Sequence, residues 1–123
     1  NEIGSRYAYA PVVASGALRG ISASQGRATG VARIARTVDE TPRIEKGAIL
    51  VCPFTDPGWT AVLDRVSAVV TETGGLLSHA AVICREYGIP AVLNVPQATE
   101  RIRDGQIVTV DGGAGIVEVE CRK

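Results

Sequence analysis

The stretch "TETGGLLSHAAVICREYGIPAV", residues 71–92, decides the local structure and the chemistry of this 123-residue chain. It contains the only histidine of the sequence, His79, four positions after a pair of glycines. Ser78 is a favourable N-cap because its hydroxyl can accept a hydrogen bond from a free backbone N–H group of the following helix. Gly88 is a typical C-cap, and the proline two residues later favours the end of the helix. The stretch therefore predicts a loop, a helix over 79–87 and a strand.

Apolar runs and turn residues on both sides of this stretch predict an α/β fold. Strands are expected over 31–38, within 46–53, over 67–72 and over 91–95, and two more within 104–120, on either side of a glycine-rich turn at 111–115. Helices are expected over about 57–65, where Asp56 and Pro57 suit the start, and over a short segment after Pro96. This order implies parallel strands in the middle, an antiparallel pair at the end, and a mixed central sheet with helices packed on it.

The chain is expected to form one domain preceded by an arm. Residues 1–19 show no sustained hydrophobic period, so we expect a linker or lead-in arm there and the domain over 20–123. A chain of this length can bury a core without disulfides or metals. No methionine occurs, even at position 1, so we expect a piece excised or processed from a longer protein.

Composition argues against several kinds of partner. Thirteen basic residues balance thirteen acidic ones, and aromatic residues are few, so nothing favours nucleic acid or an anionic membrane. No apolar run approaches the roughly 18–20 residues of a membrane span, and no signal peptide opens the chain, so we expect a cytoplasmic protein. Three separated cysteines and one histidine supply neither a zinc set nor a disulfide framework, and no metal site is expected.

The glycine pair and the histidine form a candidate phosphate site. His79 would begin its helix, beside unpaired N–H groups and the positive end of the helix dipole, which favours anions by roughly 0.3–1 kcal/mol at exposed sites. Gly74 and Gly75 lack side chains, so their backbone can approach an anionic group closely. The same field favours the neutral imidazole, which is a nucleophile. These features suit phosphoryl transfer through a phosphohistidine; the alternative is a capped, solvated histidine after an ordinary turn.

Residues 71–92 as a whole closely resemble the phosphohistidine motif of the phosphoenolpyruvate-utilising enzymes. The motif reads roughly T-x-x-G-G-x-x-S-H-A-A-[IV]-[IV]-A-R-E-x-G-I-P-A-[IV], and it is matched at Thr71, Gly74, Gly75, Ser78, His79, Ala80, Ala81, Arg85, Glu86, Gly88, Ile89, Pro90 and Ala91. Residues 18–34 and 104–119 resemble the opening and closing segments of the family, with Ser24-Gln25-Gly26 in place of the usual Ser-Pro-Gly. The resemblance covers about residues 20–120. It implies the swivelling β/β/α domain, which carries a phosphoryl group between two distant active sites.

The resemblance also implies roles for individual residues. His79 would accept the phosphoryl group on Nε2, and Thr55 would form a hydrogen bond to its ring and orient it. Gly74, Gly75 and Ser78 would hold the loop and the phosphoryl oxygens. These roles follow from the family motif and not from residue spacing.

Other positions separate the branches of the family. The string "FTDPGWT", residues 54–60, together with "GGLLSH", looks most like rifampicin phosphotransferases and proteins similar to phosphoenolpyruvate synthase. Leu77 stands where dikinases and enzyme I have threonine. Arg85 matches the family, but a phosphate contact, a salt bridge and a charge at the end of its helix are equally open for it. Glu72 is expected to be solvated surface.

The resemblance places the rest of the reaction on other domains of the parent chain. An ATP-grasp domain would split ATP, pass its β-phosphate to the histidine and release AMP, and an acceptor-substrate domain would receive the group. This sequence has neither a G-x-x-x-x-G-K-[ST] loop nor a cluster of acidic magnesium ligands, so ATP and Mg²⁺ are expected on the partner and no cofactor in this domain. The alternatives are a dikinase or enzyme I-type carrier, a non-catalytic regulatory module of this fold, and a stand-alone carrier protein.

Overall fold

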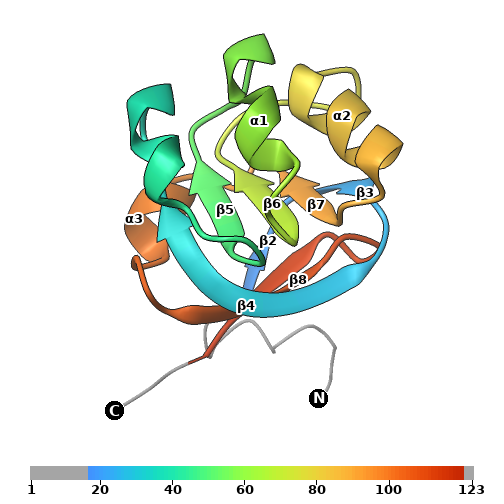
Figure 1. Ribbon diagram of the computed structural model, residues 1–123. Coiled ribbons are helices and arrows are strands. Elements are labelled where there is room, and N and C mark those ends of the chain that lie inside the picture. The colour runs from blue at the N-terminus through green and yellow to red at the C-terminus, as the bar shows by residue number, and fades with distance from the viewer. Residues whose placement is uncertain (1–16, 121–123) are drawn as a thin grey trace, which may run out of the picture.

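Three short apolar runs form the centre of the fold as strands in which every residue is buried. They are β5 (Ile49–Cys52), β6 (Ala68–Thr71) and β7 (Ala91–Leu93). β6 pairs in parallel with both of the others. Strands covered on both faces consist of continuous apolar residues, which is why these three could be predicted. The computed structural model describes residues 17–120 (Figure 1).

The other strands extend the sheet on both sides, in the order β2-β9-β8-β4-β5-β6-β7-β3. They are β2 (Ala17–Arg19), β3 (Ile21–Ser24), β4 (Arg27–Ile34), β8 (Ile107–Asp111) and β9 (Ile116–Val119). β4 takes part in both the antiparallel and the parallel half of the sheet, because residues 27–31 pair antiparallel with β8 while residues 32–34 pair parallel with β5. Figure 1 shows β4 as a long curved ribbon joining these halves. The mixed sheet predicted from the sequence is confirmed.

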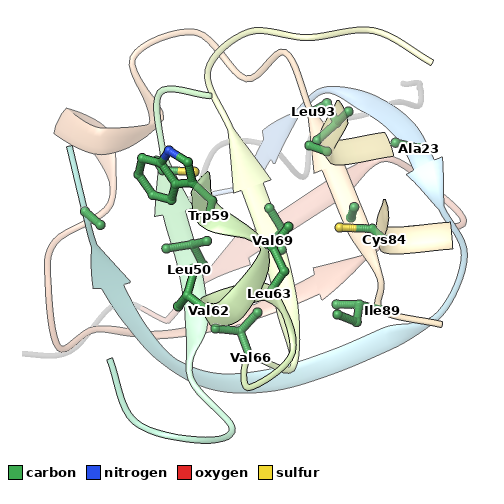
Figure 2. Close-up of a cluster of buried hydrophobic side chains, with 14 of the residues drawn as sticks. Ala23, Leu50, Trp59, Val62, Leu63, Val66, Val69, Cys84, Ile89 and Leu93 are labelled. Atoms are coloured by element: carbon green, nitrogen blue, oxygen red, sulfur yellow. The ribbon is translucent and has the colours of Figure 1, made fainter. Parts of the chain in front are cut away.

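Helices cover one face of the parallel strands. The 3₁₀ turn η3 (Pro57–Trp59) runs into α1 (Thr60–Leu63), and α2 (His79–Tyr87) lies beside α1 on the same face (Figure 1). Figure 2 shows the cluster beneath them, to which the sheet contributes Leu50 and Val69 and the helices contribute Trp59, Leu63 and Cys84. Full burial of one such aliphatic side chain stabilises the fold by about 1.5–3 kcal/mol.

The opposite face of the same strands packs on a second layer of sheet. Side chains of β5 and β6 meet those of β8, β9 and the short helix α3 (Ala98–Arg101) in a separate cluster. Its fully buried members include Ile49, Val51, Val70, Val108 and Val117. The domain therefore has three layers, β/β/α, as the family resemblance implied.

Two expectations about the first third of the chain are wrong. The strand predicted over 31–38 is β4, which ends at Ile34 and is followed by the 3₁₀ helix η2 (Val38–Arg43). η2 forms because the Thr41 hydroxyl donates to the carbonyl of Val38, and Pro42, inside the turn, has no N–H for a sheet ladder. No strand is predicted within residues 21–30, yet this segment contains β3 and the first half of β4, although its small residues have low strand propensity.

The predicted lead-in arm over 1–19 also needs correction at its end. Residues 17–19 form β2, which pairs with β9 from Ala17↔Glu118 to Arg19↔Ile116. A strand of three residues is too short to show a hydrophobic period, so the sequence did not reveal this pairing. Residues 1–16 lie outside the described part of the chain, so the rest of the arm and the domain boundary stay predictions. Within residues 17–120 no helix has the length and apolar character that crossing a bilayer requires.

Candidate functional site

The site forms at the carboxyl ends of β5 and β6. Because the two strands are parallel neighbours, the loops that follow them leave the sheet at the same edge. Backbone hydrogen bonds join the loops, since the N–H groups of Glu72 and Thr73 donate to the carbonyl of Pro53 at 3.2 and 3.1 Å. Thr55 on the first loop and His79 at the end of the second are thereby brought together.

Thr55 and His79 share a hydrogen bond, with 2.9 Å between Oγ1 and Nδ1. Thr55 is buried, and His79 is partly buried. The other ring nitrogen, Nε2, is buried without a hydrogen-bond partner, and no other side-chain nitrogen or oxygen in residues 17–120 shares this condition. A buried polar atom without a partner is costly, so its presence points to a group that meets Nε2 in another state of the domain. If Nδ1–H donates to Thr55, Nε2 keeps its lone pair and is the nucleophilic nitrogen.

Ser78 fixes the start of α2. Its Oγ accepts from the N–H of Ala81 at 3.4 Å, and its hydroxyl donates to the carbonyl of Gly75 at 2.7 Å. The N–H of Ser78 donates to the same carbonyl at 3.1 Å. The predicted N-cap is confirmed, and Gly88 closes the helix in the left-handed conformation, with φ 72°. His79 is therefore the first residue of a nine-residue helix, at the positive end of its dipole.

The two glycines of the loop differ in what they require. Gly74 has φ +115°, a conformation that favours glycine, and a Cβ there would lie 3.2 Å from Oγ of Ser78. Gly75 has no positive φ, and a Cβ there would meet nothing within 4 Å. The loop therefore needs a glycine at 74 for its own shape, whereas the backbone of Gly75 borders open space.

Arg85 links the loop to the edge of the sheet. Its Nη1 donates to the carbonyl of Ala23 on β3 at 3.1 Å, and its Nη2 donates to the carbonyl of Leu76 at 2.8 Å. The structure therefore gathers His79, Thr55, Gly74, Gly75 and Ser78 around one loop, and it places Arg85 behind that loop as a tether. The contact with Ala23 could not be recognised in the sequence, because Ala23 lies 62 residues from Arg85.

Glu72 was expected to be solvated surface, and this is wrong. Its Oε2 accepts from the backbone N–H of Thr99 at 2.9 Å and from the Thr99 hydroxyl at 2.6 Å. The carboxylate thus satisfies a free N–H at the start of α3. Glu72 anchors the beginning of the glycine loop, and no sequence signal connects these two residues.

Within residues 17–120, the cysteine and carboxylate side chains form neither a metal site nor a second nucleophilic site. No group of three His, Cys, Asp or Glu side chains within residues 17–120 could hold a metal ion. Cys52 and Cys84 are free thiols in the core. Burial raises the pKa of Cys84 to about 12, and burial together with the nearby Cys84 raises the pKa of Cys52. Both thiols therefore stay protonated and unreactive near neutral pH.

Comparison with known proteins finds relatives over most of the chain. The family model described as "PEP-utilising enzyme, mobile domain" matches residues 44–115, which include both loops and α2. Uncharacterized phosphotransferase YvkC of Bacillus subtilis (strain 168) is 52% identical over 103 residues, or 84% of this chain. Rifampicin phosphotransferase of Streptomyces sviceus is 50% identical over 107 residues, or 87% of this chain. The chain spans only 12% of the length of each of these relatives.

A solved structure of Enzyme I shares the fold. Its TM-score is 0.58 at 30% sequence identity, and the match covers 68% of this chain and 35% of that one. The fold and the family model are thus consistent with each other. This chain belongs to the PEP-utilising enzyme mobile domain family.

Proposed function

We propose that this domain is the phosphoryl carrier of a multidomain, ATP-dependent phosphotransferase, and that His79 carries the group. The proposal rests on one observation above all: Thr55 occupies Nδ1 of the ring at 2.9 Å, while Nε2 is buried without a partner. A ring held by one nitrogen, with the other left free, suits nucleophilic attack by a fixed lone pair.

The first transfer proceeds on Nε2. Its lone pair attacks the β-phosphorus of ATP, so a P–N bond forms while the P–O bond to AMP breaks, and the electron pair leaves on that oxygen. Hydrolysis of the bond between the β- and γ-phosphates then releases the γ-phosphate as inorganic phosphate and leaves the β-phosphoryl group on Nε2. The proton stays on Nδ1, where Oγ1 of Thr55 accepts its hydrogen bond. In the second transfer an acceptor oxygen attacks the phosphorus, the P–N electron pair returns to Nε2, and a base on the acceptor side takes the acceptor proton.

The loop and the helix start would stabilise the transferred group. The positive end of α2 favours the phosphoryl oxygens by about 0.3–1 kcal/mol where exposed, and by more where water is excluded. The open space beside Gly75 allows its backbone to come close to those oxygens. Gly74 and Ser78 would keep the loop in this shape.

The donor and the acceptor belong to other parts of the parent protein. We assign the donor to an ATP-grasp domain that holds ATP with Mg²⁺, passes on the β-phosphate and releases AMP and inorganic phosphate. Similarity to phosphotransferases that are much longer than this chain supports a relay among domains of one protein, which we place in the cytoplasm. A rifampicin-type or synthase-like acceptor domain is the first choice, because Leu77 stands where dikinases and enzyme I have threonine. A carrier of the dikinase or enzyme I type is the second.

Labelled ATP tests this function in the full-length protein that contains the domain. We expect acid-labile label on His79 from ATP labelled at the β-phosphate, and none in His79→Ala, whose thermal unfolding should match that of the unsubstituted protein. Label from the γ-phosphate alone would indicate a simpler kinase. No label from either, with the partner domain folded and nucleotide-bound, would leave a regulatory module. An unfolded His79→Ala variant would make the histidine structural.

A further inference from the structure

Large apolar side chains are exposed around the candidate site. Among the described residues, those with exposed large apolar side chains are Val38, Phe54, Leu76, Leu77, Val82 and Tyr87. Four of these six lie within three sequence positions of Thr55 or His79. Leu77 is 93% exposed, so almost none of its surface is used by the fold.

The positions of these four residues follow from the hydrogen bond between the two loops. Phe54 precedes Thr55, and Leu76 and Leu77 lie three and two positions before His79. Val82 lies three positions after His79, on the same side of α2. Over residues 73–84 the sequence has no Asp, Glu, Lys or Arg, so the glycine loop and the first half of α2 carry no fixed charge. The exposed charges nearby are Asp56, which follows Thr55, and Arg85, which bonds the carbonyl of Leu76.

We propose that Phe54, Leu76, Leu77 and Val82 form an apolar collar that docks on the nucleotide-binding domain of the same parent protein and excludes water from His79 during transfer. This inference rests on the proposed function and names the surface through which the donor reaches the histidine. Exposed apolar groups gathered at one place mark interaction sites, and the centres of interfaces are depleted in charge.

A nucleotide-binding domain fits this collar better than other occupants. This sequence has no phosphate-binding loop of its own, and the phosphotransferases that it resembles have most of their length outside the matched region. Water competes with the acceptor for a phosphorylated nitrogen, and a dry contact also strengthens the field of the helix start. Exposed apolar side chains beside the reactive histidine meet both needs at once.

Two serine substitutions and a matched control test the collar in the full-length protein. The double variant Leu77→Ser with Val82→Ser removes apolar surface beside His79. Tyr87→Ser removes a side chain of similar exposure, 41%, at the far end of the same helix. Serine and tyrosine have similar helix propensities. We expect the rate of His79 labelling from β-labelled ATP to fall at least tenfold in the double variant and to stay within twofold in the control, with unchanged thermal unfolding of both.

The possible results separate the collar from the function on which it rests. Labelling of the double variant at the unsubstituted rate would overturn the collar alone. Normal labelling with slow discharge to the acceptor would assign the surface to the acceptor domain, which contradicts the proposal. A dimer in analytical ultracentrifugation that the double variant dissociates would assign it to a second copy. Absence of label in the unsubstituted protein would overturn both the function and the collar.

Discussion

At the scale of single residues, the site depends on contacts that differ between neighbouring positions. Thr55 and His79 lie 24 residues apart, and one hydrogen bond between them selects Nδ1 as the held nitrogen and Nε2 as the free one. Gly74 and Gly75 are adjacent and chemically identical, yet only the first has a backbone conformation that needs glycine. The backbone shape of the loop, which depends on Gly74, can therefore be tested separately from the proposed phosphate contact at Gly75.

Substitution of each glycine by alanine should separate the two roles. We expect Gly74→Ala to lower the free energy of unfolding by about 1 kcal/mol or more, because a Cβ at φ +115° is strained and crowds Ser78. Gly75→Ala should leave stability within about 0.5 kcal/mol, since its Cβ enters open space. Under the proposed function it should still slow labelling of His79 at least tenfold. Chemical denaturation and labelling kinetics measure both effects; a destabilised Gly75→Ala variant would contradict the distinction.

At the scale of elements, α2 carries the histidine on one end and positions the loop from its side. Ser78 caps the helix, and Arg85, almost two turns later, reaches back to the carbonyl of Leu76 and across to β3. The helix, the loop and the edge strand therefore behave as one unit. These contacts use two of the five N–H donors of Arg85, so a phosphate would have to be bound by the remaining donors or after release of the tether.

Arg85→Lys should loosen the loop before any phosphate is present. Lysine has a single ammonium group in place of the guanidinium fork and cannot bridge two carbonyls in the same way. We expect amide hydrogen exchange over residues 74–78 to speed up severalfold in the unphosphorylated protein, with the rest of the sheet unchanged. Arg101→Lys, on the exposed surface of α3, provides the control. Unchanged exchange together with slower labelling would instead favour a direct phosphate contact.

At the scale of the whole molecule, one cluster of charges joins three segments that are distant in sequence. The guanidinium of Arg33 on β4 donates to Glu45 at 3.0 Å and to Asp104 at 3.1 Å, and Asp104 also accepts from the N–H of Ile34 at 2.9 Å. The bond from Arg33 lowers the pKa of Glu45. Burial acts to raise the pKa of Asp104, but the bonds from Ile34 and Arg33 outweigh it and the pKa is lowered.

Acid should therefore weaken the fold in part through Asp104. A carboxyl whose pKa is lowered by folding stabilises the domain above its unfolded pKa of about 4, and this stabilisation is lost as pH falls through the lower folded value. We expect Asp104→Asn to make the decline in Tm between pH 4 and pH 2 shallower. Asp64→Asn, at an exposed aspartate at the end of α1, provides the matched control for the substitution itself. Equal slopes for Asp104→Asn and the unsubstituted protein would exclude this contribution.

The sequence by itself determined the elements whose signals are local. The cap residues Ser78 and Gly88 lie within one helix length of each other, so α2 could be predicted over the residues that it occupies. The buried runs β5, β6 and β7 were readable because each is continuously apolar. The motif around His79 identified the family and named the candidate site, since a family resemblance is carried by residue identity over a contiguous stretch.

Only the tertiary structure decided the features that depend on distant pairing. β2 and β3 are short and made mostly of weak strand formers, and each is paired with a strand about 70 to 100 residues later in the chain. The tether from Arg85 to Ala23 and the bond from Glu72 to Thr99 likewise join residues 62 and 27 positions apart. Helix caps and apolar runs act over a few residues, whereas these contacts form only when the folded sheet brings separate segments to one edge.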